Sequence, residues 1–297
     1  QTASLGAGRT ATKIATGDYH ACAILDNGSV VCWGRNNAGQ IGDGTTTTRS
    51  SPTQTSSLGT GLAAVEITAA YGFTCAILDD GSVSCWGENA NGQLGDGTTS
   101  DRSTPTQTIS LGAGRTAAFY QDSAVYHEHV GQASQTPASP GHYVANNSWT
   151  EDVDNGLGKT IEAGSDHTCA ILDDGTVSCW GNNAWGQLGD GNGGNACPGC
   201  PDDLVSIVPV ISGVTGTVVD IGIGYRQSCA VIGNGTLYCW GYMGAQGLGD
   251  GGSDYYSHDP ILIDVDGKAV QSVSAGEYHI CALTADGSVY CWGFISN

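Results

Sequence analysis

Cysteine is the residue of this chain best suited to chemistry, because thiols form disulfides, hold metals and take part in redox reactions. Ten of the twelve cysteines form five pairs, each with nine residues between its members and a Trp-Gly directly after the second. The pairs are Cys22 and Cys32, Cys75 and Cys85, Cys169 and Cys179, Cys229 and Cys239, and Cys281 and Cys291. Regularly paired cysteines in even number are typical of oxidising compartments, so the sequence predicts a secreted protein, either extracellular or at the cell surface.

A turn signal separates the two cysteines of each pair. In residues 22–34, CAILDNGSVVCWG, the tripeptide Asp26-Asn27-Gly28 suits a three-residue hairpin loop that ends in glycine. Such a loop places Cys22 opposite Cys32 at a non-hydrogen-bonded position, where Cα atoms about 4.5 Å apart lie within reach of a disulfide. The sequence therefore predicts five hairpins, each closed by a cross-strand disulfide.

The cysteine pairs recur along the chain with a regular period. The first cysteines of successive pairs are 53, 94, 60 and 52 residues apart. Because 94 is nearly two periods, we expect a sixth unit, free of cysteine, in the irregular segment 118–160. Both faces of the hairpin strands are apolar, which is typical of strands covered on two sides. Small sheets repeated around an axis meet this need, so the sequence predicts an all-β fold: a β-propeller of about six blades, each a small antiparallel sheet.

A glycine-rich loop of one style follows Trp-Gly in several units. It reads NNAGQIGDG at 36–44, NANGQLGDG at 89–97 and NNAWGQLGDG at 182–191. Together with the hairpin before Cys-Trp-Gly, these loops resemble the regulator of chromosome condensation repeat family, over nearly the whole chain apart from residues 119–160. The resemblance implies a propeller, usually of seven blades, and members that act chiefly by binding other proteins. The paired cysteines would then mark a secreted branch of that family.

Residues 1–297 are expected to form a single propeller. The segment QTASLGAGRTA at 1–11 nearly repeats QTISLGAGRTA at 107–117, so the sequence starts within a repeat. We therefore expect residues 1–17 to complete the last blade. They would either close the ring of their own chain or complete a blade of a neighbouring molecule, which would give a head-to-tail polymer.

Two loop motifs have the residue types of metal or redox sites. Residues 191–205 are expected to form a loop insertion that Cys197 and Cys200 staple, with half of a metal site and a redox pair as alternatives. The aspartate of each Gly-Asp-Gly loop, such as Asp43, is expected to bond nearby backbone amides, with calcium binding as a weaker alternative. No other cofactor and no metal is expected.

The sequence context predicts the surroundings of three histidines and three asparagines. Three histidines lie two residues before the first cysteine of a pair, at a position that Phe73 fills in another unit, so we expect them in the blade interior. They are His20, His167 and His279. Three asparagines lie in N-x-S/T sequons and are candidates for glycosylation. They are Asn27, Asn146 and Asn234, the first and last of them at hairpin tips.

The irregular segment 118–160 holds the candidate binding or assembly residues, because departures from a repeat often mark a contact surface. They are Tyr120, Tyr126, His127, His129, Tyr143 and Trp149. The aromatic residues are of types enriched at protein interfaces, but they could equally replace the missing cysteines and tryptophan in a core. His127 and His129 would share one face of a strand, where they would either face solvent or bind zinc with a third ligand.

The composition and the absence of certain motifs argue against several classes of function. The formal charge is −20, from 29 acidic and 9 basic residues, which opposes binding to nucleic acid or to anionic membranes. No apolar run approaches the roughly 20 residues that span a bilayer, so no membrane insertion is expected. The motifs of hydrolases and metalloproteases are absent, and the acidic pair Asp79-Asp80 belongs to a hairpin turn.

We therefore expect a non-enzymatic protein that acts by association, with a protein or glycan ligand or with further copies of itself. The alternative is a structural subunit of a surface filament or layer, joined head-to-tail through its termini. A hydrolase is the third and weakest alternative.

Overall fold

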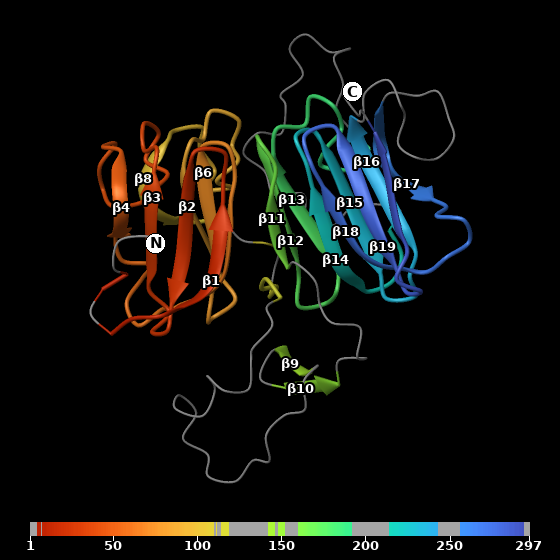
Figure 1. Ribbon diagram of the computed structural model, residues 1–297, viewed down its shortest axis with the longest axis horizontal. Coiled ribbons are helices and arrows are strands. Elements are labelled where there is room, and N and C mark those ends of the chain that lie inside the picture. The colour runs from red at the N-terminus through yellow and green to blue at the C-terminus, as the bar shows by residue number, and fades with distance from the viewer. Residues whose placement is uncertain are drawn as a thin grey trace.

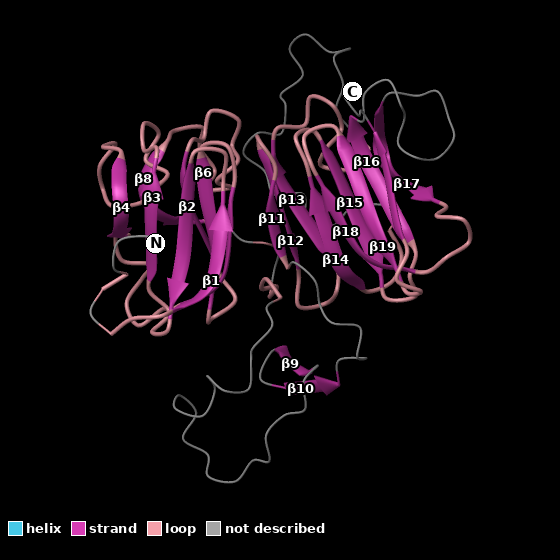
Figure 2. Cartoon of the chain, in the orientation of Figure 1, coloured by secondary structure: helices cyan, strands magenta, loops and turns pink. Residues whose placement is uncertain are grey.

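The computed structural model of the chain places most of its repeated units and leaves several connecting segments undescribed. The described residues are 5–6, 8–109, 111, 114–118, 142–145, 148–151, 160–191, 214–242 and 256–293. Within them every regular element is a strand, as Figure 2 shows. The same residues contain no helix long and apolar enough to cross a membrane.

Five antiparallel sheets form consecutive blades, numbered 1 to 5 along the chain (Figure 1). Blade 1 contains β1 (Ala11–Thr16), β2 (His20–Leu25), β3 (Val30–Gly34) and β4 (Arg49–Gln54). Blade 2 contains β5 (Ala64–Ala69), β6 (Phe73–Leu78), β7 (Val83–Gly87) and β8 (Arg102–Gln107). Blade 3 contains β11 (Ile161–Ala163), β12 (His167–Ile171) and β13 (Val177–Gly181). Blade 4 contains β14 (Val218–Ile223), β15 (Gln227–Ile232), β16 (Leu237–Tyr242) and β17 (Tyr256–Ile263). Blade 5 contains β18 (Val270–Ala275), β19 (His279–Thr284) and β20 (Val289–Gly293). A separate pair is formed by β9 (His142–Ala145) and β10 (Ser148–Glu151).

The hairpins have the predicted register. Gly28 closes the first loop with a φ of 73°, and Cys22 lies opposite Cys32 with their Cα atoms 4.1 Å apart. The same cross-strand disulfide joins the other four predicted pairs, each with a Cα separation of 4.1 Å. The prediction of five disulfide-closed hairpins in an all-β propeller is therefore confirmed. Cys197 and Cys200 lie outside the described residues.

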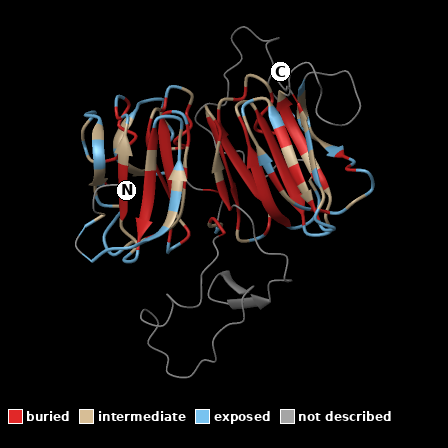
Figure 3. Cartoon of the chain, viewed as in Figure 1, coloured by how far each residue is buried: buried red, intermediate tan, exposed pale blue. Residues whose placement is uncertain are grey.

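The blades pack face to face through the apolar residues of their two central strands. The face that carries the cysteines turns toward the next blade, and the face that carries the tryptophan turns toward the preceding one, so blades 1 and 2 share one core around Ile24 and Trp86. Blades 2 and 3, 3 and 4, and 4 and 5 form equivalent cores. Because a blade in the middle of the row packs against a neighbour on each side, its central strands are buried on both faces, as Figure 3 shows for blades 2, 3 and 4.

The structure corrects the expectation of a sixth unit at 118–160. Trp180 of blade 3 donates a hydrogen bond to the backbone carbonyl of Gln93 in blade 2, so these two blades are direct neighbours. Ala118 donates its N–H to the carbonyl of Ile171, and Ile171 donates its own N–H to the carbonyl of Thr160. Ala118 and Thr160 thus act as adjacent residues of one inner strand. Residues 119–159 are therefore inserted into the first strand of blade 3.

The insertion coincides with a β-bulge that the other blades share. The pairing of the inner strand with its neighbour skips one residue in each of them, between Ala64 and Glu66 in blade 2. Blades 1, 4 and 5 skip at the same position. Without residues 119–159, the 94-residue cysteine spacing would equal the 53 residues that separate Cys22 from Cys75. A bulge tolerates added chain, because its extra residue is already outside the ladder of hydrogen bonds.

A second correction concerns the N-terminal segment, residues 1–17. Residues 11–16 form β1, which pairs with β2 as the inner strand of blade 1, and do not complete the last blade. The reason is that the segment shared by residues 1–11 and 107–117 precedes an inner strand in both places. Residues 1–4 and 7 lie outside the described part of the chain.

Candidate binding face

The glycine-rich loops all lie at one end of the blades, where β2 and its equivalents begin. In blade 1, Asp43 accepts hydrogen bonds from the backbone and hydroxyl of Thr45 at 3.0 and 2.7 Å and from Nε of Arg49 at 2.6 Å. Asn36 donates to the carbonyls of Thr45 and Thr47. Asp96 of blade 2 is bound by Thr98 and Arg102 in the same way. The aspartates therefore hold the loops together.

Protonation chemistry agrees with this role of the aspartates. Burial opposes the ionisation of Asp43, but the hydrogen bonds from Thr45 and Arg49 outweigh it and hold the pKa of the carboxyl below its usual value. The pKa of Asp96 is lowered in the same balance, with Thr98 and Arg102 as donors. Each carboxylate is thus occupied by this chain's own donors, which favours a structural role over calcium binding.

Each loop also presents one carbonyl to the next blade. The carbonyl of Gln40 accepts hydrogen bonds from Nε1 of Trp86 and from the hydroxyl of Thr74, both at 3.0 Å. Gln93 and Gln187 repeat the arrangement with the following blades. The tryptophan of Cys-Trp-Gly is therefore the anchor that fixes the loop of the preceding blade.

Two of the three histidines predicted in the blade interior lie there. His20 and His167 are buried, and Nε2 of each contacts a hydroxyl of the next blade, at 2.8 Å for Thr74 and 2.9 Å for Ser228. Burial lowers their pKa values to about 4 and about 3. His279 is exposed, which corrects the prediction, because no described blade follows blade 5.

Several aromatic and charged side chains, which we call the aromatic belt, lie at this same end, which we call the loop end. Tyr19 and Tyr71 meet edge to face with ring centroids 5.8 Å apart, and Tyr225 and Tyr278 do so at 5.7 Å. Trp185 contacts Tyr242 at 4.6 Å. Two arginines stack on these rings, Arg35 on Tyr19 and Arg226 on Tyr225 and Trp185. The belt resembles a protein-binding surface in residue type, since Tyr, Trp and Arg are enriched in interfaces.

The centre of the loop end is a cavity of about 960 Å³, formed where the inner strands of all five blades end. Tyr71 and Tyr225 stand in its wall, and none of the described residues that line it is a lysine or an arginine. Its acidic lining residues are Asp18, Glu66, Glu162, Asp166 and Glu277. Glu66 pairs with Lys13, and Glu162 accepts the N–H of Ile223 at 2.7 Å.

Two carboxyl groups concentrate negative charge beside blade 3: Asp166, which lines the cavity, and Glu88, which is not among the lining residues. Burial raises the pKa of Asp166, against the attraction of Arg226. Burial also raises the pKa of Glu88, and repulsion from Asp166 and Asp101 adds to the shift. A cation that binds beside such carboxyl groups stabilises their ionised form. The cavity and its surroundings therefore suit a positively charged partner group.

The residues predicted for binding or assembly are only partly placed. Tyr143 lies on β9 opposite Thr150, and Trp149 lies on β10 opposite Val144. Tyr120, Tyr126, His127 and His129 lie outside the described residues, as does Asn146. Asn27 and Asn234 are exposed at hairpin tips at the opposite end, which we call the hairpin end. The side-chain oxygen of each accepts the backbone N–H two residues later.

Sequence reasoning missed the aromatic belt. Tyr19 and Tyr278 lie three residues before the first cysteine of their pairs, and Tyr71 and Tyr225 lie four before. Aligning all five units at those two positions would have found them. The tyrosine shifts between these two positions from repeat to repeat and is missing from blade 3, so no single motif displays the belt.

Comparison with known proteins gives a match over almost the whole chain. A family model described as RCC1-like domain matches residues 2–297. The human E3 ubiquitin-protein ligase HERC2 is 26% identical over 294 residues, which cover 97% of this chain and 5% of that protein. The ultraviolet-B receptor UVR8 of Arabidopsis thaliana is 28% identical over 282 residues, covering 89% of this chain and 60% of the receptor. The chain thus spans less than two thirds of the length of either relative.

Solved structures resemble the blades as well. The structure of human WBSCR16 superposes with a TM-score of 0.69 at 19% identity, covering 96% of this chain and 62% of that one. Yeast RCC1 (Prp20), in its complex with Kap60, superposes with a TM-score of 0.51 at 18% identity, covering 95% of this chain and 69% of that one. At these identities the likeness concerns the fold alone.

Proposed function

Because this chain belongs to the family of RCC1-like domains, we propose that it is a non-enzymatic binding protein whose loop end receives a basic segment of a partner protein. The observation that carries the proposal is the acidic cavity at the loop end, in whose wall Tyr71 and Tyr225 of the aromatic belt stand. Carboxylates and aromatic faces together attract lysine and arginine side chains, and the stacking of Arg35 and Arg226 on neighbouring rings is this same contact within the chain. That Prp20 is a protein-binding relative of this fold supports association as the mode of action.

We further propose that the protein works outside the cell. Five hairpin disulfides fit an oxidising compartment, in which they constrain the unfolded chain. In that setting Asn27 and Asn234 would be accessible to glycosylation. Glycans there would sit at the hairpin end and leave the loop end free for a partner.

The test of the binding proposal is titration of the full chain with a peptide rich in lysine and arginine, and with an acidic peptide of the same length. The double variant Asp166→Asn and Glu277→Gln removes two charges from the cavity with little change of shape. We expect it to weaken binding of the basic peptide about tenfold in Kd, and more at low salt.

The matched control is the double variant Asp79→Asn and Asp266→Asn. It removes the same charge from exposed positions at the hairpin end and should leave the Kd within about twofold. Equal weakening by both double variants would mean that the net charge of the chain, and not the cavity, attracts the peptide. Failure of the intact chain to prefer the basic peptide would overturn the proposal.

A second candidate function is that of a structural subunit joined head-to-tail. The observation that favours it is the face of blade 5 that carries Cys291, which none of the described residues covers, whereas the corresponding faces of blades 1 to 4 are buried. In this candidate the propeller would be a building block of an extracellular filament or layer.

A further inference from the structure

We propose that the junction of blades 3 and 4 carries a second binding site, an aromatic platform on which the sugar rings of a neutral oligosaccharide stack. The platform consists of Trp185, Tyr242, Tyr256 and His258. None of these four residues is among those that line the acidic cavity, so the site adds to the function proposed above and does not depend on it.

Three separate segments of the chain form the platform. Trp185 lies in the glycine-rich loop of blade 3, which is anchored on blade 4 because the carbonyl of Gln187 accepts the indole N–H of Trp240 at 2.9 Å. Tyr242 ends β16, and Tyr256 begins β17 directly opposite it. The packing of blades 3 and 4 therefore fixes where the loop and the two strands meet.

The rings of the platform are in contact with one another. The ring centroid of Trp185 lies 4.6 Å from that of Tyr242 and 6.4 Å from that of Tyr256. Tyr256 and His258 share one face of β17, because they are two residues apart, and their centroids are separated by 5.1 Å. Tyr256 is 46% exposed, and the other three side chains are half-buried. The four rings thus form one contiguous surface that remains accessible in part.

The equivalent junction of blades 1 and 2 has no aromatic residue at these four positions, which are Ala38, Glu88, Asp101 and Ser103. Backbone contacts establish the equivalence. Ala38 and Trp185 each donate their N–H to the side chain of the glutamine two residues later. The outer strands align through the glycine of Cys-Trp-Gly, which pairs with Arg102 in blade 2 and with Ser257 in blade 4. Because departures from a repeat often mark a contact surface, aromatic residues at all four positions indicate a binding site.

The platform also presents hydrogen-bonding groups that the described chain leaves open. The indole N–H of Trp185 and the hydroxyls of Tyr242 and Tyr256 have no hydrogen-bond partner among the described residues. Trp180 and Trp240, by contrast, each donate to a loop carbonyl. A sugar ring has an apolar C–H face and a rim of hydroxyls, so it can stack on an aromatic face and replace water at the polar groups beside it. Ring faces next to open N–H and O–H groups therefore suit a saccharide.

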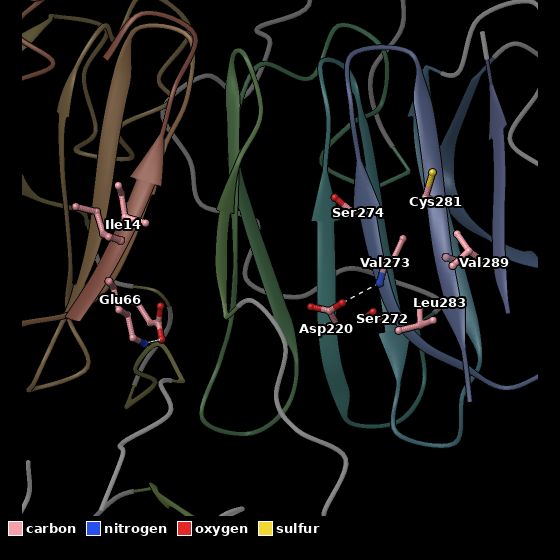
Figure 4. A pocket seen from close by; sticks show the side chains of 12 residues that line it. Ile14, Glu66, Asp220, Ser272, Val273, Ser274, Cys281, Leu283 and Val289 are labelled. Atoms are coloured by element: carbon pink, nitrogen blue, oxygen red, sulfur yellow. Dashed lines mark hydrogen bonds and ion pairs between the residues drawn. The ribbon is translucent and has the colours of Figure 1, made fainter. Parts of the chain in front are cut away.

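A second cavity in the structure differs from the platform. It measures about 650 Å³ and lies between blades 1 and 5, with Ile14 on one side and Val289 on the other (Figure 4). None of its described lining residues is aromatic. Asp220 in its wall is occupied within the chain, since it accepts the N–H of Val273 at 2.8 Å. Ring faces on which a sugar can stack are thus not a feature of every opening between blades.

The distances between the rings argue against a proline-rich peptide as the ligand. Such peptides dock into aromatic-lined grooves. A ring held between two aromatic faces needs them about 7–8 Å apart, which is twice an atomic contact distance of about 3.5–4.0 Å. Trp185 and Tyr242 are only 4.6 Å apart, so no slot separates them. The ligand must therefore lie on the platform, as a flat pyranose ring does.

Charge restricts the saccharide to a neutral one. The net charge of −20 repels an acidic sugar. Arg226, the cation beside the platform, is stacked 5.1 Å from the ring centre of Trp185 and donates to the hydroxyl of Tyr225 at 3.2 Å. It also attracts the carboxylate of Asp166. An acidic sugar would therefore meet no uncommitted cation among the described residues of the platform and its surroundings.

The test is calorimetric titration of the full chain with four neutral hexasaccharides: cellohexaose, xylohexaose, mannohexaose and chitohexaose. We expect at least one of them to bind with a Kd of about 1 mM or tighter. The variants Trp185→Asn and Tyr256→Thr install the residues that blades 2 and 1 have at these positions, Asn91 and Thr48. Each variant should weaken binding of that hexasaccharide about tenfold or more.

Leu262→Thr is the matched control, because it introduces the same residue near the other end of β17, where Leu262 is 59% exposed. It should leave the Kd within about twofold, as substitutions at exposed positions away from a site do. Tyr256→Thr should still bind the basic peptide as the intact chain does. That result shows that the variant is folded and that the platform and the acidic cavity are separate sites.

Failure of all four hexasaccharides to bind at about 10 mM would overturn the inference. Binding that Trp185→Asn and Tyr256→Thr leave unchanged, or that Leu262→Thr weakens equally, would overturn it as well, because the sugar would then not lie on the platform. A proline decamer is the remaining probe. If it bound in place of the sugars and lost affinity in Trp185→Asn and Tyr256→Thr, the platform would be a peptide site and the inference would be wrong.

Discussion

At the scale of single residues, two buried histidines make the blade interfaces sensitive to acid. The hydroxyl of Thr74 donates to the carbonyl of Gln40, so its oxygen is left to accept the Nε2–H of His20. Nδ1 of His20 then carries the lone pair and has no partner among the described residues. Protonation would place an unsatisfied charge in the core. His167 stands in the same relation to Ser228.

The pH dependence follows from the direction of these shifts. The folded pKa values, about 4 for His20 and about 3 for His167, lie below the unfolded value of 6.5, so the unfolded state takes up protons first as the pH falls. Stability is full above pH 6.5 and decreases below it, by about 2 kcal/mol for each histidine between pH 6.5 and 5. Denaturant unfolding at a series of pH values measures this slope.

The chain provides the control for this prediction. His20→Phe installs the residue that blade 2 has at the same position, Phe73, which is buried. The variant gives up the hydrogen bond to Thr74 and should be somewhat less stable at pH 8, but its stability should fall with pH only about half as steeply. Parallel pH profiles for the intact chain and the variant would show that His20 does not carry the effect.

At the scale of elements, the inner strand of blade 3 should tolerate loss of its insertion. Deleting residues 119–159 joins Ala118 to Thr160, which already bond to the same residue, Ile171. We expect a melting temperature within about 4 °C of the intact chain, equivalent to about 1 kcal/mol. Calorimetry of the two chains measures the difference.

A deletion longer by one residue is the matched control. Removing residues 119–160 shifts the strand so that Glu162 takes the buried place of Ile161. This chain should melt well below the shorter deletion. Equal melting temperatures would mean that β11 does not depend on the register seen in the structure.

The same element shows where sequence reasoning reaches its limit. The hairpin register was predictable because a turn of known length fixes which residues oppose each other, and Cys22 and Cys32 confirmed it within 11 residues of chain. The split strand was not predictable, because Ala117 and Ala118 are too few to display a period, and their partners Leu172 and Ile171 are far along the sequence. The loop end was missed for a related reason, since five separate turns assemble it.

At the scale of the whole molecule, the net charge of −20 should make folding depend on ionic strength. Acidic residues outnumber basic ones about threefold, so like charges repel across the folded chain more than ion pairs attract. Salt screens such repulsion over about 10 Å at 0.1 M. The melting temperature should therefore rise between about 10 mM and 150 mM sodium chloride, and choline chloride should act equally, because screening does not depend on the identity of the cation. A fall in melting temperature with salt would instead mean that attraction within ion pairs outweighs the repulsion. Arg49 and Arg102 form such pairs with their loop aspartates.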